Sequence, residues 1–306
     1  MLSFEALVAY ARNAGRSLAV FSQPDISPLV HLVPASQFTF DELVAAYNQT
    51  RVDYIVPMPM NAARLREYVN NYDVDLDASA VAMAGDQILG LAMLGVRPGH
   101  TWITRLGVLP VKRRYGTGRL LMEYLIAQSR RLKVDYIVLE VIKNNTPAHR
   151  LFLKLGFRER RELLVVRRPP GSPVTDVNHY HYEPLGHHAA VELLHQRRSV
   201  PSWLDDTPSL ENAGSLAALR VELETGDQGW VVYQDTVFQL GRLVLQTESG
   251  DSHHVGLALA HALHTRHPTQ DTKSENLPTT DPHWPALQAS GYIESFGRIE
   301  MRLDLV

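Results

Sequence analysis

The stretch from Val108 to Leu125, VLPVKRRYGTGRLLMEYL, is the feature that most constrains the fold of this 306-residue chain. An apolar, β-branched run stops at Pro110, and a helical repeat of apolar residues begins after Gly116 and Gly118. These glycines let the chain turn tightly at the helix start, where several backbone N–H groups have no partner inside the helix. We therefore expect an anion cradle between a strand and a helix.

Three arginines surround this helix start. Arg113, Arg114 and Arg119 add charged donors to the outward N–H groups and to the positive end of the helix dipole. A pyrophosphate is the anion that suits such a loop best. The spacing matches neither G-x-x-x-x-G-K-[ST] nor G-x-G-x-x-G, which disfavours nucleoside triphosphates and NAD.

The order of predicted elements indicates the fold class. Between Leu29 and Arg168 it reads strand, helices, three strands, helix, strand, helix, strand. Thr39 is expected to cap the first helix of this set, Gly156 to close the last, and residues 158–168 to complete the sheet. The order predicts an α/β (α+β) fold with a mixed, mostly antiparallel sheet flanked by helices.

Length and internal similarity predict two domains. The chain is about twice the ~150 residues usual for one domain, and the C-terminal WPALQASGYIESFGRIEMRLDL echoes the earlier RLFLKLGFRERRELLVV. We expect an N-terminal extension over residues 1–26 with a helix from Phe4 to Asn13. A first domain over 27–168, a Pro- and Gly-bearing linker over 169–178 and a second, degenerate copy over 179–306 follow.

Composition excludes several classes of function. Hydrophobic residues make up 45% of the chain, enough for a buried core, and a net charge of −3 gives no general attraction to nucleic acid or to anionic membranes. The chain has no cysteine, and its 14 histidines form no H-E-x-x-H pattern, so no metal site is predicted. No apolar run reaches the ~18 residues of a membrane span, which favours a cytoplasmic protein.

Two motifs together resemble the GNAT superfamily of acyl-CoA-dependent N-acyltransferases. Residues 113–118, RRYGTG, are similar to the family's pyrophosphate loop, [QR]-x-x-G-x-[GA]. The later pattern N-x-x-A-x-x-L-[YF]-x-x-x-G-F is met by Asn145, Ala148, Leu151, Phe152, Gly156 and Phe157. The resemblance covers Leu29 to Arg168 well and the second half in outline. It implies two tandem GNAT-like domains and acetyl-CoA as cosubstrate, with no metal.

The resemblance also implies the roles of individual residues. Backbone groups of the splayed fourth strand would pair with the pantetheine arm, the glycine loop would hold the pyrophosphate, and Asn145 would bond the pantetheine end. Glu140, in the strand LEV, is the candidate general base, or else a carboxylate that only orients backbone or water. The implied cofactor-binding residues are Leu106, Gly107, Val108, Arg113, Arg114, Tyr115, Gly116, Thr117, Gly118, Arg119, Asn145 and Phe152.

One departure from the family pattern concerns the general acid. The subgroup's usual acid is a tyrosine at the position that Phe152 holds here, and a phenyl ring cannot donate a proton. The acid is therefore unassigned. The segment from Asp53 to Asn61, DYIVPMPMN, either lines an acceptor pocket or packs against the core.

The second half is expected not to bind CoA. Glu248 and Asp251 stand where the first half has arginines, and carboxylates there would repel a pyrophosphate. This half would support the fold or wall the acceptor site.

The resemblance implies an N-acetyltransferase. The enzyme would transfer an acetyl group from acetyl-CoA to the amine of a small molecule or a peptide, by direct attack in a ternary complex, with a homodimer as a possible assembly. One alternative is an idle acyl-CoA-binding sensor or scaffold. The other is a mycothiol-synthase-like tandem acetyltransferase, in which the working site is expected in the C-terminal copy.

Overall fold

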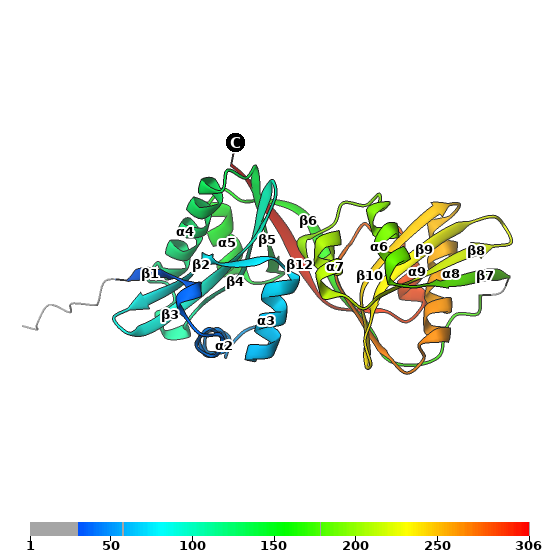
Figure 1. The fold of residues 1–306 in the computed structure, drawn as a ribbon, viewed down its shortest axis with the longest axis horizontal. Coiled ribbons are helices and arrows are strands. Elements are labelled where there is room, and N and C mark those ends of the chain that lie inside the picture. Colours follow the sequence, from blue (N-terminus) through cyan, green and yellow to red (C-terminus); the bar gives the residue numbers. More distant parts are fainter. Residues whose placement is uncertain (1–29, 57, 178, 306) are drawn as a thin grey trace, which may run out of the picture.

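The computed structural model describes residues 30–56, 58–177 and 179–305, so the helix expected from Phe4 to Asn13 lies outside the described residues. Two lobes share one 12-stranded sheet, in the order β1-β2-β3-β4-β5-β12-β6-β11-β10-β9-β8-β7 (Figure 1). The expected class, a mixed and mostly antiparallel sheet flanked by helices, is confirmed.

The N-terminal half follows the predicted order. Thr39 caps the first α-helix with a full capping box, and Gly156 follows the last one with φ of 94°, as expected. The elements are β1 (His31–Pro34), η1 (Ala35–Gln37), α2 (Phe40–Gln49), α3 (Ala62–Asn71), β2 (Val74–Ala84), β3 (Gln87–Arg97), β4 (His100–Val108), η2 (Pro110–Lys112), α4 (Thr117–Arg131), β5 (Tyr136–Ile142), α5 (Thr146–Lys154) and β6 (Arg158–Arg168).

The C-terminal half repeats this plan and contains two elements, α7 and β11, that the sequence patterns did not predict. Its elements are β7 (Tyr180–Leu185), α6 (His187–His195), η3 (Trp203–Asp205), α7 (Thr207–Ala213), β8 (Leu216–Leu223), β9 (Gln228–Asp235), β10 (Gln239–Ser249), α8 (Ser252–Arg266), β11 (Asp271–Pro278), α9 (Trp284–Ala289) and β12 (Ile293–Asp304).

The last strands of the two halves cross between the lobes. β12 lies between β5 and β6, antiparallel to both, while β6 also pairs with β11. In Figure 1, β12 runs in red from the right-hand lobe into the left-hand lobe. We expected residues 158–168 to complete the sheet of the first half without help, and the structure corrects this. The two strands have similar patterns, so exchanging them costs little local structure.

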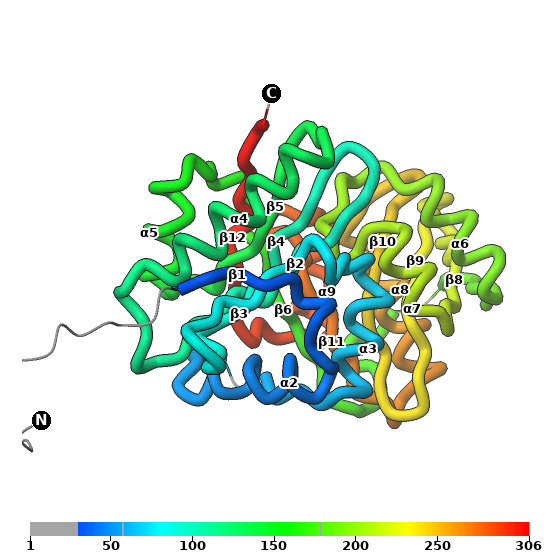
Figure 2. Tube along the Cα trace, turned by 60° about the vertical axis from the view of Figure 1, so that its left-hand side comes forward, coloured from blue at the N-terminus to red at the C-terminus, as the bar shows by residue number. Residues whose placement is uncertain are grey.

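Helices cover both faces of the sheet in each half. In the N-terminal half, α4 packs Leu121 and Leu125 onto one face, while α2 packs Leu43 and Tyr47 onto the other. Figure 2 shows α4 and α5 on one side of β1, β2 and β3, and α2 on the opposite side. The C-terminal half is layered in the same way, with α8 and α9 in one core and α6 and α7 in another.

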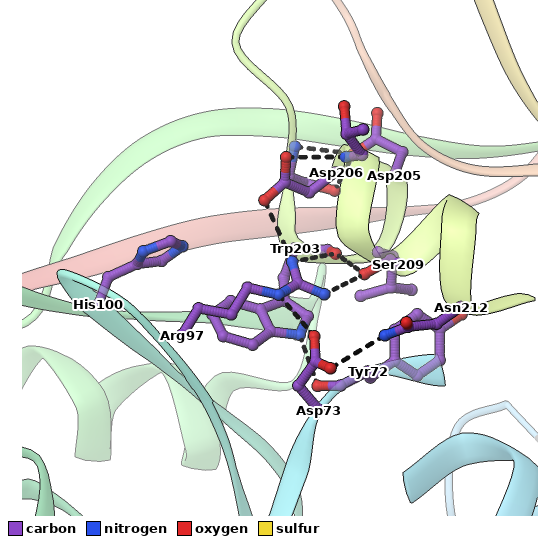
Figure 3. A network of polar contacts seen from close by, with 12 residues as sticks. Tyr72, Asp73, Arg97, His100, Trp203, Asp205, Asp206, Ser209 and Asn212 are labelled. Carbon is purple, nitrogen blue, oxygen red and sulfur yellow. Dashed lines mark hydrogen bonds and ion pairs between the residues drawn. The ribbon is translucent and has the colours of Figure 1, made fainter. Parts of the chain in front are cut away.

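A buried arginine fastens the two lobes together (Figure 3). At the end of β3, Arg97 donates from Nε to Asp73 (2.7 Å) and from Nη1 to Asp206 of the C-terminal half (3.1 Å). Its guanidinium lies 4.1 Å from the ring centroid of Trp203. Trp203 in turn stacks on Trp102, with ring centroids 5.7 Å apart and planes 14° apart. This contact holds η3 and α7 against the ends of β3 and β4.

The same contact explains a glycine in β3. A Cβ atom at Gly95 would lie 2.7 Å from Cζ2 of Trp203, closer than van der Waals contact permits. The indole Nε1 of Trp203 also donates to the carbonyl of Tyr72 (3.0 Å). Gly95 is therefore required by the packing between the lobes.

Candidate active site

The strands β4 and β5 separate where the resemblance implies a pantetheine arm. Their parallel pairing runs from His100 and Tyr136 to Ile103 and Leu139 and stops there. A bulge follows, at which Arg105 has φ of 55° and no direct partner on β3. Residues 104–108 thus present a backbone edge to the gap between the strands. Leu106, Gly107 and Val108 all lie on this edge.

The glycine loop leaves the start of α4 open. Gly116 is the N-cap, with φ of 89°, and no side chain caps the helix. A Cβ atom at Gly118 would make only ordinary contacts, 3.6 Å from Val108 and 3.7 Å from Leu151. The packing of the described residues therefore does not require a glycine at 118, whereas an anion approaching the backbone N–H groups would. Thr117 is buried and Tyr115 is 82% exposed.

Two of the loop's arginines are engaged by carboxylates. Arg113 forms a two-pronged ion pair with Asp53, with both N–O distances 2.7 Å, and donates to the carbonyl of Thr50 (3.0 Å). Hydrogen bonds from Arg113 lower the pKa of Asp53. Arg113 thus ties the α2–α3 loop to the end of β4. Arg119 pairs with Glu123 at 2.7 Å on the exposed face of α4, and Arg114 is exposed.

The second motif places one residue at a helix start and one in the core. Asn145 caps α5, since its side chain accepts from the backbone N–H of Ala148 (3.4 Å). Phe152 is only 5% exposed and packs in the core against Phe157, with ring centroids 6.2 Å apart. The structure therefore does not bring Phe152 to the cavity described next.

A cavity of about 380 Å³ lies between the lobes. Four residues of the segment from Asp53 to Asn61 line it, so this segment forms a pocket wall. Five residues of the C-terminal half also line it. The lining residues are Arg51, Tyr54, Met58, Pro59, Met60, Arg64, Glu67, Tyr68, Asn71, Tyr72, Trp102, Thr104, Arg105, Glu140, Ile142, Leu204, Arg242, Lys273, Glu275 and Arg298.

Glu140 projects from β5 into this cavity with both carboxylate oxygens hydrogen-bonded. Oε2 accepts from Nε1 of Trp102 (2.6 Å) and Oε1 accepts from Nδ2 of Asn276 (3.2 Å). Burial raises the pKa of Glu140 to about 7, and the negative charge of Glu300, directly opposite on β12, acts in the same direction. The hydrogen bond from Trp102 opposes these effects only in part. Glu140 therefore exchanges a proton near neutral pH.

The exchanged strand brings the C-terminal half to this carboxylate. Arg298 of β12 donates to Oδ1 of Asn276 (2.7 Å) and to Glu275 (2.7 Å). Burial alone would raise the pKa of Glu275, but Arg298 and Lys273 outweigh it and hold the pKa at about 2. The sequence patterns indicate neither Asn276 nor Arg298, because β11 is too polar to be predicted as a strand and β12 is expected in the sheet of the second half.

The corresponding helix start in the C-terminal half is closed. Asp251 caps α8 and accepts from the backbone N–H groups of His253 and His254, both at 2.9 Å. These bonds lower the pKa of Asp251. A negative charge thus occupies the position that is open at Gly116, which agrees with the expectation that this half does not hold a pyrophosphate.

Within residues 30–56, 58–177 and 179–305, no group of three or more His, Asp or Glu side chains is arranged to hold a metal ion. Within those residues, no helix combines the length and apolar character needed to cross a membrane.

Comparison with known proteins finds a family model that matches most of the N-terminal half. Residues 43–157 match the model of the acetyltransferase (GNAT) family. This half, with its open helix start and its separated β4 and β5, is therefore similar to the GNAT acetyltransferases, a family that uses acetyl-CoA to acetylate amines. A search of curated proteins finds no match.

Solved structures extend the likeness of fold to both halves. A tandem GNAT protein from the clavulanic acid biosynthesis pathway superposes with a TM-score of 0.60 at 15% identity, covering 90% of this chain and 98% of that one. A GCN5-related N-acetyltransferase from Sphaerobacter thermophilus gives 0.64 at 17%, covering 90% and 95%. A putative acetyltransferase from Pyrococcus horikoshii gives 0.56 at 16%, covering 92% and 90%. The chain thus has the fold of a tandem GNAT protein.

Proposed function

We propose that this protein is an acetyl-CoA-dependent N-acetyltransferase with one working site, in the N-terminal half. The observation that carries the proposal is the combination of three features: an uncapped helix start at Gly116, a backbone edge along Leu106 to Val108 that pairs with no residue of β5, and a cavity lined by Glu140. The N–H groups of Gly116 to Gly118, with Arg114 and Arg119, would hold the pyrophosphate. Residues 106–108 and Asn145 would hold the pantetheine arm.

The chemistry requires a base more than a covalent catalyst. Acetyl-CoA supplies an activated thioester. The nitrogen of the neutral amine forms a bond to the acetyl carbon, Glu140 takes, directly or through water, the proton that this nitrogen then loses, and the carbon–sulfur bond breaks. The CoA thiolate takes its proton from water, because Phe152 has none to give. A base whose pKa is about 7 suits this step at neutral pH.

A calorimetric titration tests the cradle directly. Acetyl-CoA should bind wild-type protein at one site per chain, and Gly118→Glu should abolish binding, because the new carboxylate would occupy and repel the pyrophosphate position. Gly186→Glu is the control, since Gly186 lies at the start of another helix, α6, and a Cβ atom there meets nothing within 4 Å. Full binding by the Gly118→Glu protein would refute the proposed cradle.

A second candidate function is an acyl-CoA-binding sensor without turnover. The phenylalanine at 152 favours it, because the usual acid at that position is a tyrosine and a phenyl ring has no hydroxyl to donate a proton. Acetyl-CoA binding at one site, combined with no release of free CoA over a wide amine panel, would establish the sensor and exclude the transferase.

A further inference from the structure

The cavity beside Glu140 is strongly basic although the chain as a whole carries an acidic excess. Its lining includes six basic and three acidic side chains, whereas the whole chain has 30 basic and 33 acidic residues. The basic side chains are Arg51, Arg64, Arg105, Arg242, Lys273 and Arg298, and the acidic ones are Glu67, Glu140 and Glu275. Positive charge is therefore concentrated where the acceptor would bind.

The acidic side chains do not neutralise all of this charge. Glu275 forms ion pairs with Lys273 and Arg298, both at 2.7 Å, and acts on Arg105 only through space. Glu140 is hydrogen-bonded to neutral donors, and Glu67 is exposed at the rim. Four arginines remain, of which Arg64 is exposed at the rim. We name the other three, Arg51, Arg105 and Arg242, the arginine cluster. Among the described residues, no carboxylate forms an ion pair with any of them.

Two members of the arginine cluster share one aromatic wall. Arg51 lies 4.6 Å from the ring centroid of Tyr47 and 4.5 Å from that of Tyr54, and Arg105 lies 4.0 Å from that of Tyr68. Arg105 also donates to the hydroxyl of Tyr47 (2.8 Å). The Nε atoms of both arginines are buried, and neither has a hydrogen-bond partner among the residues described. The guanidinium groups of Arg51 and Arg105 thus pack against tyrosine rings, and each keeps an Nε–H donor without an acceptor among the described residues.

The third member comes from the equivalent place in the other half. Arg105 follows the end of the β4–β5 pairing and has φ of 55°, and Arg242 follows the end of the β10–β11 pairing and has φ of 56°. Arg242 donates to the carbonyl of Leu204 and to the side chain of Gln234, both at 3.2 Å, and lies 5.1 Å from the ring of Tyr72. The duplication thus turns two matching bulge arginines toward one cavity.

Guanidinium groups that lie partly buried without a carboxylate are costly unless an anion joins them. We propose that the acceptor is an amine that also carries an oxyanion, either a carboxylate or a phosphate. The arginine cluster binds this oxyanion while the amine faces Glu140. This inference rests on the proposed function. The same positive charge disfavours the ammonium form of the amine, which assists its deprotonation. It also disfavours lysine-rich peptides as acceptors.

Matched pairs of amines test this proposal. Free CoA is measured with a thiol reagent, which gives no background because the chain has no cysteine. One arm compares the L-α-amino acids with their α-carboxamides, and the other compares O-phosphoethanolamine with ethanolamine. The anionic member of at least one pair should have a kcat/KM at least tenfold higher than its neutral partner. The arm that responds identifies the oxyanion as carboxylate or phosphate.

Variants then assign the effect to the arginine cluster. Arg51→Gln and Arg242→Gln should each raise KM for the anionic acceptor about 10- to 100-fold, the worth of one charge-assisted hydrogen bond, and leave KM for its neutral partner within about twofold. Arg66→Gln is the control, because Arg66 lies on α3 over the ring of Phe40 and outside the cavity lining. Equal use of neutral and anionic amines would overturn the proposal while the transferase stands.

A binding measurement decides the case in which no amine of either arm reacts. Inorganic phosphate and acetate are titrated into protein saturated with acetyl-CoA, so that the glycine loop is already occupied. At least one of these anions should bind the wild type about tenfold more tightly than Arg242→Gln. Equal binding by both proteins would overturn the anionic acceptor, and failure of acetyl-CoA itself to bind would instead refute the proposed function.

Discussion

At the scale of single residues, Glu140 determines the expected pH dependence. Burial raises its pKa to about 7 from the ordinary 4.5, and only the carboxylate accepts a proton. We therefore predict that kcat/KM increases as pH rises through about 7 and then levels. Glu140→Gln should remove this rise and lower kcat by about 10² to 10⁴, the usual contribution of a general base. Steady-state rates from pH 5.5 to 9 measure both effects.

The control for this prediction is Glu192→Gln, an exposed change on α6 that should keep the wild-type pH profile. If Glu140→Gln kept both the rise near pH 7 and the full rate, Glu140 would only orient its neighbours Trp102 and Asn276.

Local motifs predicted part of this site, but they could not predict contacts between residues that are far apart in the sequence. The glycine loop, the separated strand and Glu140 follow from short patterns read along the chain. The donors to Glu140 do not, since Trp102 lies 38 residues away and Asn276 lies 136 residues away. For Phe152 the motif predicted a contact with the cofactor, whereas the structure packs this side chain in the core.

At the scale of elements, most helices and strands were predictable because their apolar periodicity is strong. β11 was not, because its sequence DTKSENLP is polar, although Thr272, Ser274 and Asn276 are all buried. Its backbone bonds to β6 and β10 and its packing against η3 stabilise it, and none of these partners is near in sequence. Tertiary context therefore decided this strand.

The contact between β3 and the η3–α7 segment gives a prediction at the same scale. Arg97→Ala leaves Asp73 and Asp206 without their shared cation and removes the guanidinium from the face of Trp203. We expect the free energy of unfolding to fall by about 2–3 kcal/mol, less than for a fully buried pair because both carboxylates are partly exposed. Urea denaturation followed by tryptophan fluorescence measures it.

The comparison variant is Arg119→Ala, which removes an exposed pair with Glu123 and should cost at most about 0.5 kcal/mol. A loss for Arg97→Ala no larger than that of Arg119→Ala would show that the ion pairs of Arg97 do not stabilise the contact between the lobes.

At the scale of the whole molecule, the duplication was visible in the sequence and the strand exchange was not. β6 and β12 share a local pattern, so nothing within either segment says which sheet it joins. The choice is made by long-range pairing: β12 pairs with β5 from Ile142 to Tyr136 and shields the strand that carries Glu140. The two halves are therefore not separable units, although each has its own core clusters.

Dividing the chain tests this conclusion. A fragment that ends at Arg168 keeps the whole glycine loop but loses β12, which exposes the apolar edge of β5 and leaves Arg161 without Glu300. We predict that residues 27–168 alone aggregate or fail to bind acetyl-CoA by calorimetry. Co-expression with residues 169–306 should restore a complex that binds one acetyl-CoA, because β12 can then insert between β5 and β6. A soluble, acetyl-CoA-binding monomer of 27–168 would show that the first half completes its fold without the exchanged strand.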